Sequence, residues 1–289
     1  MQMWFCPKEY SLKIAVLMTC FNRKEKTRIC LQRLAVATSL IDEDLFVSLV
    51  DAGDDATAEL AAEFDFVESI CSPGLYWAGG MRLAESTVLD SNKNPDFLLW
   101  LNDDVYLDAD SLAKVIGCST RNPNSIVIGS LRGATGEVTY GGLIRSRLNP
   151  LRYHLYAKEI EAEVDGFCGN LVLMPRSVYE RLGRISEHFV HTLADREYGI
   201  RARLAGTPMV AMAGTVGYCE QNGPAGTLSD GNLGSTARWR LLSDPKGPPQ
   251  QEWNFVAKLE TRWWWMFSYI RFHHFITSPI RSVLNRQNS

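Results

Sequence analysis

Short apolar runs alternate with segments of helical periodicity from residue 13 to about residue 130. Runs of this length, ended by polar turns, are typical of buried strands, and they stand at 13–19, 46–50, 66–69 and 97–101. Apolar residues at helical spacing predict the intervening helices, one through Cys30, Leu34 and Ala37 and two more near 57–63 and 78–89. This alternation predicts an α/β fold with a Rossmann-like, mostly parallel sheet and helices on both faces.

The pattern changes after about residue 130. Gly-rich turns on either side of 137–140 predict a hairpin within 132–145. Beyond it, the pattern predicts two strands, at 167–174 and 209–213, and two helices, at 177–182 and 195–205. We therefore expect a single domain over 1–238, made of two halves at about 1–130 and 131–238.

From residue 239 onward the chain is aromatic and basic, and we assign 239–289 to a helical C-terminal extension. Within 257–289, five Lys or Arg residues stand against one acidic residue. Aromatic rings favour the headgroup layer of a membrane, and cations favour anionic lipids. We therefore expect 252–286 to rest peripherally on a membrane surface. The alternative is that these aromatic residues pack against the preceding domain as an additional layer of core.

Composition narrows the class of protein. The 289 residues are 46% hydrophobic and 22% charged, as in a globular protein, and the net charge of -3 argues against a nucleic-acid partner. The seven cysteines are scattered, with no C-x-x-C pair, which favours a reducing cytoplasm. We expect no signal peptide in residues 1–10 and no membrane-spanning helix, since neither pattern is present.

Acidic side chains follow two of the predicted strands directly. Asp103 and Asp104 come after the strand at 97–101, and Asp51 follows the strand at 46–50. Ligands of open α/β sheets bind outside the carboxyl ends of the strands. Two adjacent carboxylates raise each other's proton affinity unless a cation is near, and Mg²⁺ or Mn²⁺ would relieve that repulsion and bind a diphosphate.

Each acidic residue also has a local explanation. Asp103 or Asp104 is placed to cap a helix that begins near Asp108, and Asp51 suits an ordinary turn. Asp195 stands at the start of a predicted helix, where a capping aspartate is common. Its other interpretation is a general base in a polar surround. The spacing of the residues does not decide between these alternatives.

Several segments, in this order, resemble the motifs of the inverting glycosyltransferase family 2, whose members have the GT-A fold. Some are most similar to the rhamnosyl- and galactofuranosyl-transferase-like branch of that family. The segments are 18–23 (MTCFNR), 50–57 (VDAGDDAT), 74–80 (GLYWAGG), 102–104 (NDD), 169–176 (GNLVLMPR) and 195–201 (DREYGIR). They are spread in order over roughly two thirds of the chain, which makes the resemblance far more specific than any single motif.

The resemblance implies transfer of a sugar, with inversion, from a UDP- or dTDP-linked donor to a glycan or lipid-linked acceptor. It also implies a place in cell-surface polysaccharide, cell-wall or glycolipid synthesis. The cysteine usage and the C-terminal extension place the protein in the cytoplasm, on the cytoplasmic face of the membrane. Asp195 would be the catalytic base, and Asp104 with Asp103 would hold Mn²⁺ or Mg²⁺. The implied donor contacts are Thr19, Asn22, Arg23, Asp51, Asp55, Gly79, Gly80 and Asp103. The implied acceptor contacts are Trp77, Glu197 and Arg201, although Trp77 is equally suited to the core.

The sequence departs from the family pattern at some positions. Met81 and Arg82 replace a frequent Asn pair, so the sugar specificity does not carry over. A histidine that often completes the metal site has no clear match, which leaves His188, His191 and Cys219 as candidate third ligands or as structural residues.

Two other functions remain open from the sequence. A nucleotidyltransferase acting on a sugar phosphate is disfavoured because the first strand lacks a following Gly-rich, basic loop. A non-catalytic, membrane-associated module that binds a nucleotide sugar is the second, because fold alone does not guarantee turnover.

Overall fold

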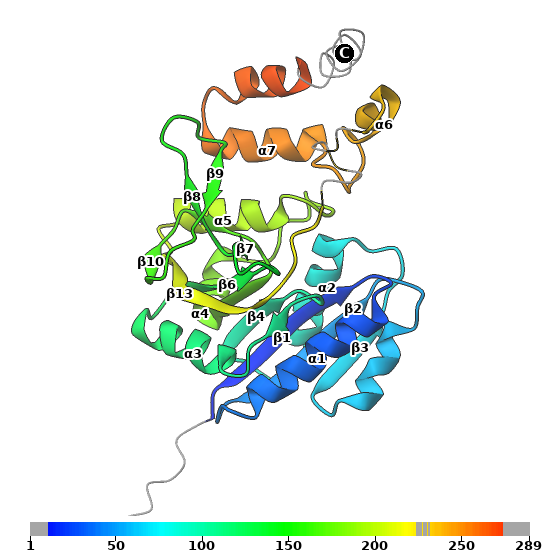
Figure 1. The fold of residues 1–289 in the computed structure, drawn as a ribbon, viewed down its shortest axis with the longest axis vertical. Coiled ribbons are helices and arrows are strands. Elements are labelled where there is room, and N and C mark those ends of the chain that lie inside the picture. The colour runs from blue at the N-terminus through cyan, green and yellow to red at the C-terminus, as the bar shows by residue number, and fades with distance from the viewer. Residues whose placement is uncertain (1–10, 224–226, 228–229, 231, 274–289) are drawn as a thin grey trace, which may run out of the picture.

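A large mixed sheet runs through the middle of the molecule (Figure 1). In the computed structural model, which describes residues 11–223, 227, 230 and 232–273, this sheet has ten strands. The strands are β1 (Lys13–Cys20), β2 (Asp44–Asp51), β3 (Val67–Cys71), β4 (Phe97–Leu101), β5 (Tyr106–Leu107), β6 (Ile126–Arg132), β7 (Val138–Tyr140), β10 (Ala162–Glu163), β12 (Leu171–Pro175) and β13 (Met209–Tyr218). A separate small sheet joins β8 (Gly142–Arg145), β9 (Tyr153–Leu155) and β11 (Gly166–Phe167).

The order of the strands in the large sheet is β10-β13-β6-β12-β4-β1-β2-β3, with β5 beside β13 and β7 beside β6. Strands β4, β1, β2 and β3 are mutually parallel neighbours, whereas β12 is antiparallel to both β4 and β6. This arrangement confirms the predicted α/β fold with a mostly parallel central sheet. Because β1, β2 and β4 run in the same direction, their carboxyl ends meet at one edge of the sheet.

Helices cover both faces of this sheet, as the sequence predicts. They are α1 (Lys24–Thr38), the 3₁₀ helix η1 (Thr57–Glu63), α2 (Trp77–Leu89), α3 (Ser111–Arg121), α4 (Arg176–Leu182) and α5 (Ala194–Leu204). Helices α6 (Ser235–Arg240) and α7 (Gln250–Glu260) follow in the C-terminal part of the chain, beyond α5 in Figure 1. Along β1, Ile14 and Val16 belong to the core that includes α1, η1 and α3, while Ala15 and Leu17 belong to the core under α2, α4 and α5. The strand period of two therefore assigns alternate side chains to two separate cores.

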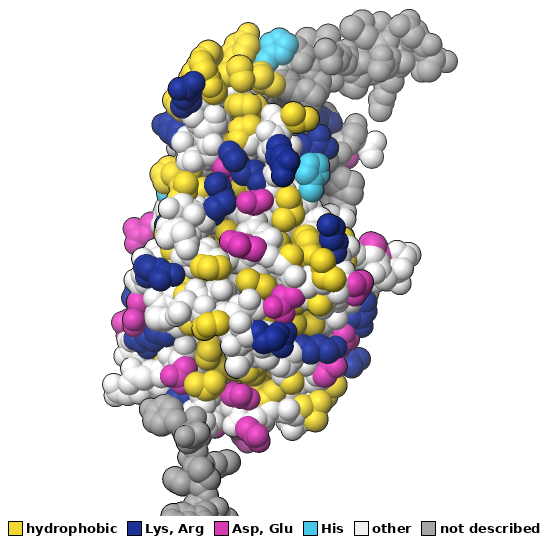
Figure 2. All heavy atoms as spheres, turned by 90° about the vertical axis from the view of Figure 1, so that its left-hand side faces the viewer, with side chains coloured by type: hydrophobic (Ala, Val, Ile, Leu, Met, Phe, Trp, Pro, Cys, Tyr) yellow, Lys and Arg dark blue, Asp and Glu magenta, His cyan; other side chains and the backbone are white. Residues whose placement is uncertain are grey.

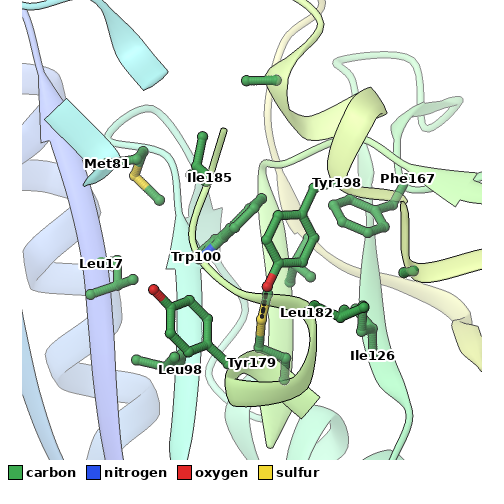
Figure 3. Close-up of a cluster of buried hydrophobic side chains, with 14 of the residues drawn as sticks. Leu17, Met81, Leu98, Trp100, Ile126, Phe167, Tyr179, Leu182, Ile185 and Tyr198 are labelled. Carbon is green, nitrogen blue, oxygen red and sulfur yellow. Dashed lines mark hydrogen bonds between the residues drawn. The ribbon is translucent and has the colours of Figure 1, made fainter. Parts of the chain in front are cut away.

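Trp100 of β4 is the centre of the second core (Figure 3). Its ring is fully buried and lies edge-on to Tyr198 of α5 at 4.9 Å and to Trp77 of α2 at 5.8 Å. The Tyr198 hydroxyl donates to the Met174 sulfur at 3.6 Å, the bond that is dashed in Figure 3. The aromatic contacts fix α2 and α5 relative to β4, and these three elements carry residues of the candidate site.

The predicted strand at 167–174 is wrong as a single element. It is divided into β11 and β12 by residues 168–170, which belong to neither strand. The Gly169 N–H donates to the Asp195 carboxylate, and the Asn170 carbonyl accepts from Asn102. The break therefore turns the backbone toward the residues of the site.

The C-terminal extension contains two different layers. Helix α7 packs on the body through Val256 and Ala257, which are fully buried, and through Phe255. Its last residue, Glu260, has a buried carboxylate that pairs with Arg145 and Arg203, each at 2.8 Å. In α7 the aromatic and apolar residues therefore form the additional layer of core that was the alternative interpretation.

Residues 264–273 form a further helix beside α7 (Figure 1). The Ser268 hydroxyl donates to Asn254 at 2.7 Å, and Arg271 donates to Gln250 at 3.0 Å. Residues 263–273 carry exposed apolar side chains: Trp263, Trp265, Met266, Tyr269, Ile270 and Phe272. No helix within the described residues is long and apolar enough to cross a membrane. The expectation for residues 1–10, and the parts of the extension beyond 273, lie outside the described residues.

Candidate active site

The loops after β1 and β2 pack against each other. Asn22 has a φ of 51°, and its side-chain oxygen accepts the Asp54 N–H at 2.8 Å. A Cβ on Gly53 would lie 2.1 Å from that same oxygen, so only glycine fits there. The two loops hold Arg23, the residue after Asn22, over the carboxyl end of β4.

Asp51 and Asp55 bind backbone groups of these loops. Both oxygens of the buried Asp51 carboxylate are used, one by the Gly53 N–H at 3.0 Å and the other by the Ala58 N–H at 2.8 Å. Asp55 accepts the Lys24 N–H at 2.9 Å, at the first residue of α1. The structure thus gives both aspartates a local structural role, and their donor contacts stay predictions.

The acidic pair is bridged by an arginine. The Arg23 guanidinium lies 2.7 Å from Asp103 and 2.9 Å from Asp104. Asp103 is almost fully buried, and burial, opposed by Arg23 and reinforced by Asp104, raises its pKa to about 7. Neither carboxylate caps α3, whose N-cap is Asp110, so the capping interpretation is wrong.

Asp104 is the member of the pair that reaches solvent, with 17% of its side chain exposed against 1% for Asp103. Beside it lies the Cys219 thiol, 3.7 Å from the Asp104 oxygen. Burial and the Asp104 charge raise the pKa of that thiol to about 12. Within the described residues no group of three or more His, Cys, Asp or Glu side chains is arranged to hold a metal ion.

The carboxylates of the acidic pair can still suit Mg²⁺. Mg²⁺ is commonly bound by one or two carboxylates together with the phosphates of a substrate. Asp104 supplies one accessible carboxylate, and its other ligands would have to come from substrate and water. Of the candidate third ligands, His188 packs against Phe255 with ring centroids 4.4 Å apart, His191 lines the pocket described below, and Cys219 alone touches Asp104.

Asp195 lies in the first turn of α5, two residues after the N-cap residue Leu193. Its carboxylate accepts the Gly169 N–H at 3.0 Å and the Arg196 N–H at 2.7 Å. Burial raises its pKa above that of an ordinary aspartate, and the two N–H groups and the Arg196 charge oppose the shift. The carboxylate is thus held in a fixed orientation with increased basicity. Asp195 is not the N-cap, but its bond to Arg196 supports the start of the helix.

Trp77 and Asp195 both lie beside Gly169. A Cβ on Gly169 would come within 3.1 Å of both the Trp77 ring and the Asp195 Cβ, so the glycine allows the close approach. The Trp77 indole N–H donates to the Asn102 side chain at 2.9 Å. Asn102 is the first residue of the NDD segment, and it therefore ties the tryptophan to the acidic loop.

Glu197 and Arg201 contact each other and the end of α4. They form an ion pair at 3.0 Å along α5. Arg201 also donates to the carbonyls of Leu182 at 2.6 Å and Arg184 at 3.1 Å, at the end of α4. These bonds fix α5 to the segment after α4, and an acceptor contact by either side chain stays a prediction.

A pocket of about 580 Å³ opens beside these residues. Its walls combine aromatic, apolar and cationic side chains: Thr19, Cys20, Phe21, Arg23, Ala52, Gly74, Leu75, Tyr76, Trp77, His191 and Lys246. Gly80 lets α2 approach this wall, since a Cβ there would lie 2.2 Å from the Thr19 hydroxyl, and Gly79 stands beside Leu75. The volume and the mixed lining are typical of small-molecule sites.

The sequence analysis missed several residues of this pocket. Lys246 is far along the chain from every motif, and only the fold brings it here. His191 was a candidate metal ligand, and its ring instead lies 5.7 Å from that of Tyr76. Tyr76 and Leu75 stand within the GLYWAGG segment, so the motif itself was the available signal.

The sequence from residue 15 to residue 183 matches the model of the family described as glycosyl transferase family 2. The chain belongs to this family. The family 2 domain thus contains the loops after β1, β2 and β4, whereas Asp195 and Lys246 lie beyond the matched residues. No curated protein matches the sequence.

The fold of this family 2 glycosyltransferase is similar to crystal structures of TarS from S. aureus. For TarS 1-349 the TM-score is 0.55, with 11% identity over 91% of this chain and 74% of that chain. For TarS the TM-score is 0.54, with 11% identity over 86% of this chain and 43% of that chain. At this identity the similarity shows the fold, the GT-A fold that the sequence predicts.

Proposed function

We propose that this family 2 glycosyltransferase transfers a sugar from a nucleoside diphosphate, UDP or dTDP, to an acceptor hydroxyl with inversion at the anomeric carbon. The observation that carries this proposal is the position of Trp77. Trp77 lines the pocket, and both its ring and the Asp195 Cβ lie beside Gly169. A donor in the pocket would therefore have its sugar next to the basic carboxylate.

The reaction is a direct displacement. The acceptor oxygen bonds to the anomeric carbon as the bond to the nucleoside diphosphate breaks, and the acceptor proton passes to Asp195. Its two N–H partners, from Gly169 and Arg196, orient the carboxylate, and its raised pKa suits proton abstraction. General-base catalysis of this kind contributes roughly 10²–10⁴-fold. We place Trp77 under the transferred or accepting sugar, and Glu197 with Arg201 at the outer edge of the acceptor site.

A divalent cation held by Asp104 would balance charge in the donor site, where Arg23 offsets the charge of the acidic pair. Mn²⁺ or Mg²⁺, when bound, would neutralise charge on the departing diphosphate as a Lewis acid. Asp103 holds Arg23 in place, and Thr19, Gly79 and Gly80 form the wall on which the donor lies. Asn22, Asp51 and Asp55 shape the loops that face the nucleoside.

Turnover tests the proposal. Purified protein is incubated with UDP-, dTDP- and GDP-sugars and Mn²⁺, with and without a membrane lipid extract as acceptor, and nucleoside diphosphate release is measured. We expect release from one donor class. The family assignment disfavours a nucleotidyltransferase, and a protein that binds a nucleotide sugar without any release would be the non-catalytic module instead.

We further propose that the protein works at the cytoplasmic membrane face, on a lipid-linked acceptor of the rhamnosyl- or galactofuranosyl-transferase-like branch, in cell-surface polysaccharide synthesis. The support is the exposed segment 262–273, where Trp263, Trp265 and Tyr269 have half or more of their surface exposed. Figure 2 shows hydrophobic side chains gathered at this end of the molecule. Arg262 and Lys258 add positive charge beside them.

Flotation with anionic liposomes tests this contact. We expect the protein to float at low salt, and Trp263→Ser, Trp265→Ser and Tyr269→Ser together to abolish flotation, because interfacial aromatics and cations act jointly. The matched control replaces three exposed apolar residues near α1, Ile29, Val36 and Leu40, by Ser. The membrane contact is ruled out if wild-type protein stays in the soluble fraction, or if both triple variants float equally well.

A further inference from the structure

One wall of the pocket comes from outside the family domain. The matched residues end at 183, yet the turn at 243–247 brings Lys246 into the lining. The ammonium group lies close enough to His191, another lining residue, to lower the pKa of its ring together with burial, which is the larger cause. The pocket is therefore completed by the C-terminal part of the chain.

The turn that carries Lys246 is held firmly. The Lys246 N–H donates to the Asp244 carboxylate at 2.9 Å, and the Gly247 N–H donates to the Asp244 carbonyl at 3.0 Å. The Gly247 carbonyl accepts the Thr192 hydroxyl at 3.2 Å, which attaches the turn to the segment before α5. A Cβ on Gly247 would lie 2.9 Å from the Leu241 carbonyl oxygen, so glycine is required for this packing. The position of Lys246 therefore results from several specific contacts.

The lining of the pocket carries positively charged side chains and no negatively charged ones. Of the two strong cations in the lining, the Arg23 guanidinium already pairs with Asp103 and Asp104, whereas no ion pair of Lys246 is found among the described residues. The neighbouring walls, Phe21, Tyr76 and Trp77 among them, are aromatic and suit a base or a sugar ring. An anion joined to ring systems would satisfy both kinds of wall.

We propose that Lys246 binds the diphosphate of the nucleoside-diphosphate donor, which makes the segment around 241–250 a part of the donor site. This inference rests on the proposed function. Lysine binds phosphate as a point charge, and the attraction grows as the sugar bond breaks and charge develops on the leaving diphosphate. Lys246 is thus a positioning residue for the donor and a stabiliser of the leaving group.

Calorimetry on the full chain tests this inference. The probes are UDP, dTDP and GDP, the corresponding monophosphates and inorganic pyrophosphate, all with Mn²⁺. For the nucleoside diphosphate that the wild-type protein binds most tightly, we expect Lys246→Met to weaken binding by about ten- to a hundredfold, since it removes a charge-assisted contact. The monophosphate should lose less, and Lys246→Arg should retain most of the affinity. Lys158→Met, a change at an exposed lysine outside the pocket, is the matched control.

Each outcome separates this inference from the proposed function. If Lys246→Met binds the diphosphate as Lys158→Met does, or loses the monophosphate equally, the role of Lys246 is overturned while the donor site stands. If wild-type protein binds pyrophosphate as tightly as the nucleotide, the pocket holds a diphosphate from another source and the donor assignment is overturned. If wild-type protein binds none of the nucleotides, the proposed function itself fails.

Discussion

Replacing Asp195 by Asn is expected to lower sugar transfer by at least about a hundredfold and to leave donor affinity nearly unchanged. Asn matches the aspartate in size, and its side-chain oxygen can still accept the Gly169 N–H that the carboxylate accepts at 3.0 Å. What it loses is the ability to take a proton. Initial rates with donor and acceptor, together with calorimetric binding of the nucleoside diphosphate, measure the two effects separately.

A structural role for Asp195 predicts a different result. Asn supports a helix start about as well as Asp does, so transfer would survive the change if the residue only stabilised α5. Asp110→Asn, at the N-cap of α3, is the matched control for an aspartate at a helix start. Turnover within a few-fold of wild type in Asp195→Asn would remove the base assignment.

The same residue sets an expected pH dependence. The carboxylate works as a base only when ionised, and burial raises its pKa above the ordinary aspartate value. Activity should therefore fall as the pH drops through this raised pKa, at a higher pH than an exposed aspartate would give, and it should be recovered on returning above it. The residual activity of Asp195→Asn should lack this acidic limb in its profile of kcat/KM against pH. An unchanged limb in the variant would assign it to another group.

The parallel half of the fold could be predicted because local pattern and tertiary environment agree there. Strands such as β1 are apolar on both faces. Helix α1 buries Cys30, Leu34 and Ala37, the residues whose spacing predicted it. The NDD segment could be placed for the same reason, since β4 ends where its apolar run ends. Family motifs then supplied the remaining candidate roles.

The parts that the sequence could not predict depend on contacts between distant segments. The apolar run at 167–174 is locally a strand, and it is interrupted where the Gly169 N–H bonds to the distant Asp195 carboxylate. The ion pairs of Arg23 with the acidic pair join residues about 80 positions apart, which no local pattern encodes. Both α7 and the helix after it are rich in aromatic residues. The sequence therefore could not predict that α7 packs on the body while one side of the following helix is exposed.

A conservative change at Asp104 is expected to remove the effect of a divalent cation on donor binding. In wild-type protein, Mn²⁺ should tighten binding of the nucleoside diphosphate, because a hard cation can join the accessible Asp104 oxygen to phosphate oxygens. Asp104→Asn lacks the negative charge that the ion requires, while Asp103, held by Arg23 at 2.7 Å and Thr27 at 3.3 Å, keeps its own contacts. We expect the gain on adding Mn²⁺ to fall by at least about tenfold, which is a loss of about 1.4 kcal/mol.

Calorimetric titration of the nucleoside diphosphate, with Mn²⁺ and with a chelator, measures that gain for each protein. Asp54→Asn is the matched control, because Asp54 is an exposed aspartate in the loop after β2 at the same edge of the sheet. Cys219→Ser tests the neighbouring thiol, which lies 3.7 Å from Asp104, and it should lower the gain only if sulfur is a ligand. Affinity that still rises with Mn²⁺ in Asp104→Asn as it does in wild-type protein would place the cation elsewhere. Wild-type affinity that does not change with Mn²⁺ would leave Arg23 as the group that offsets the charge of the acidic pair.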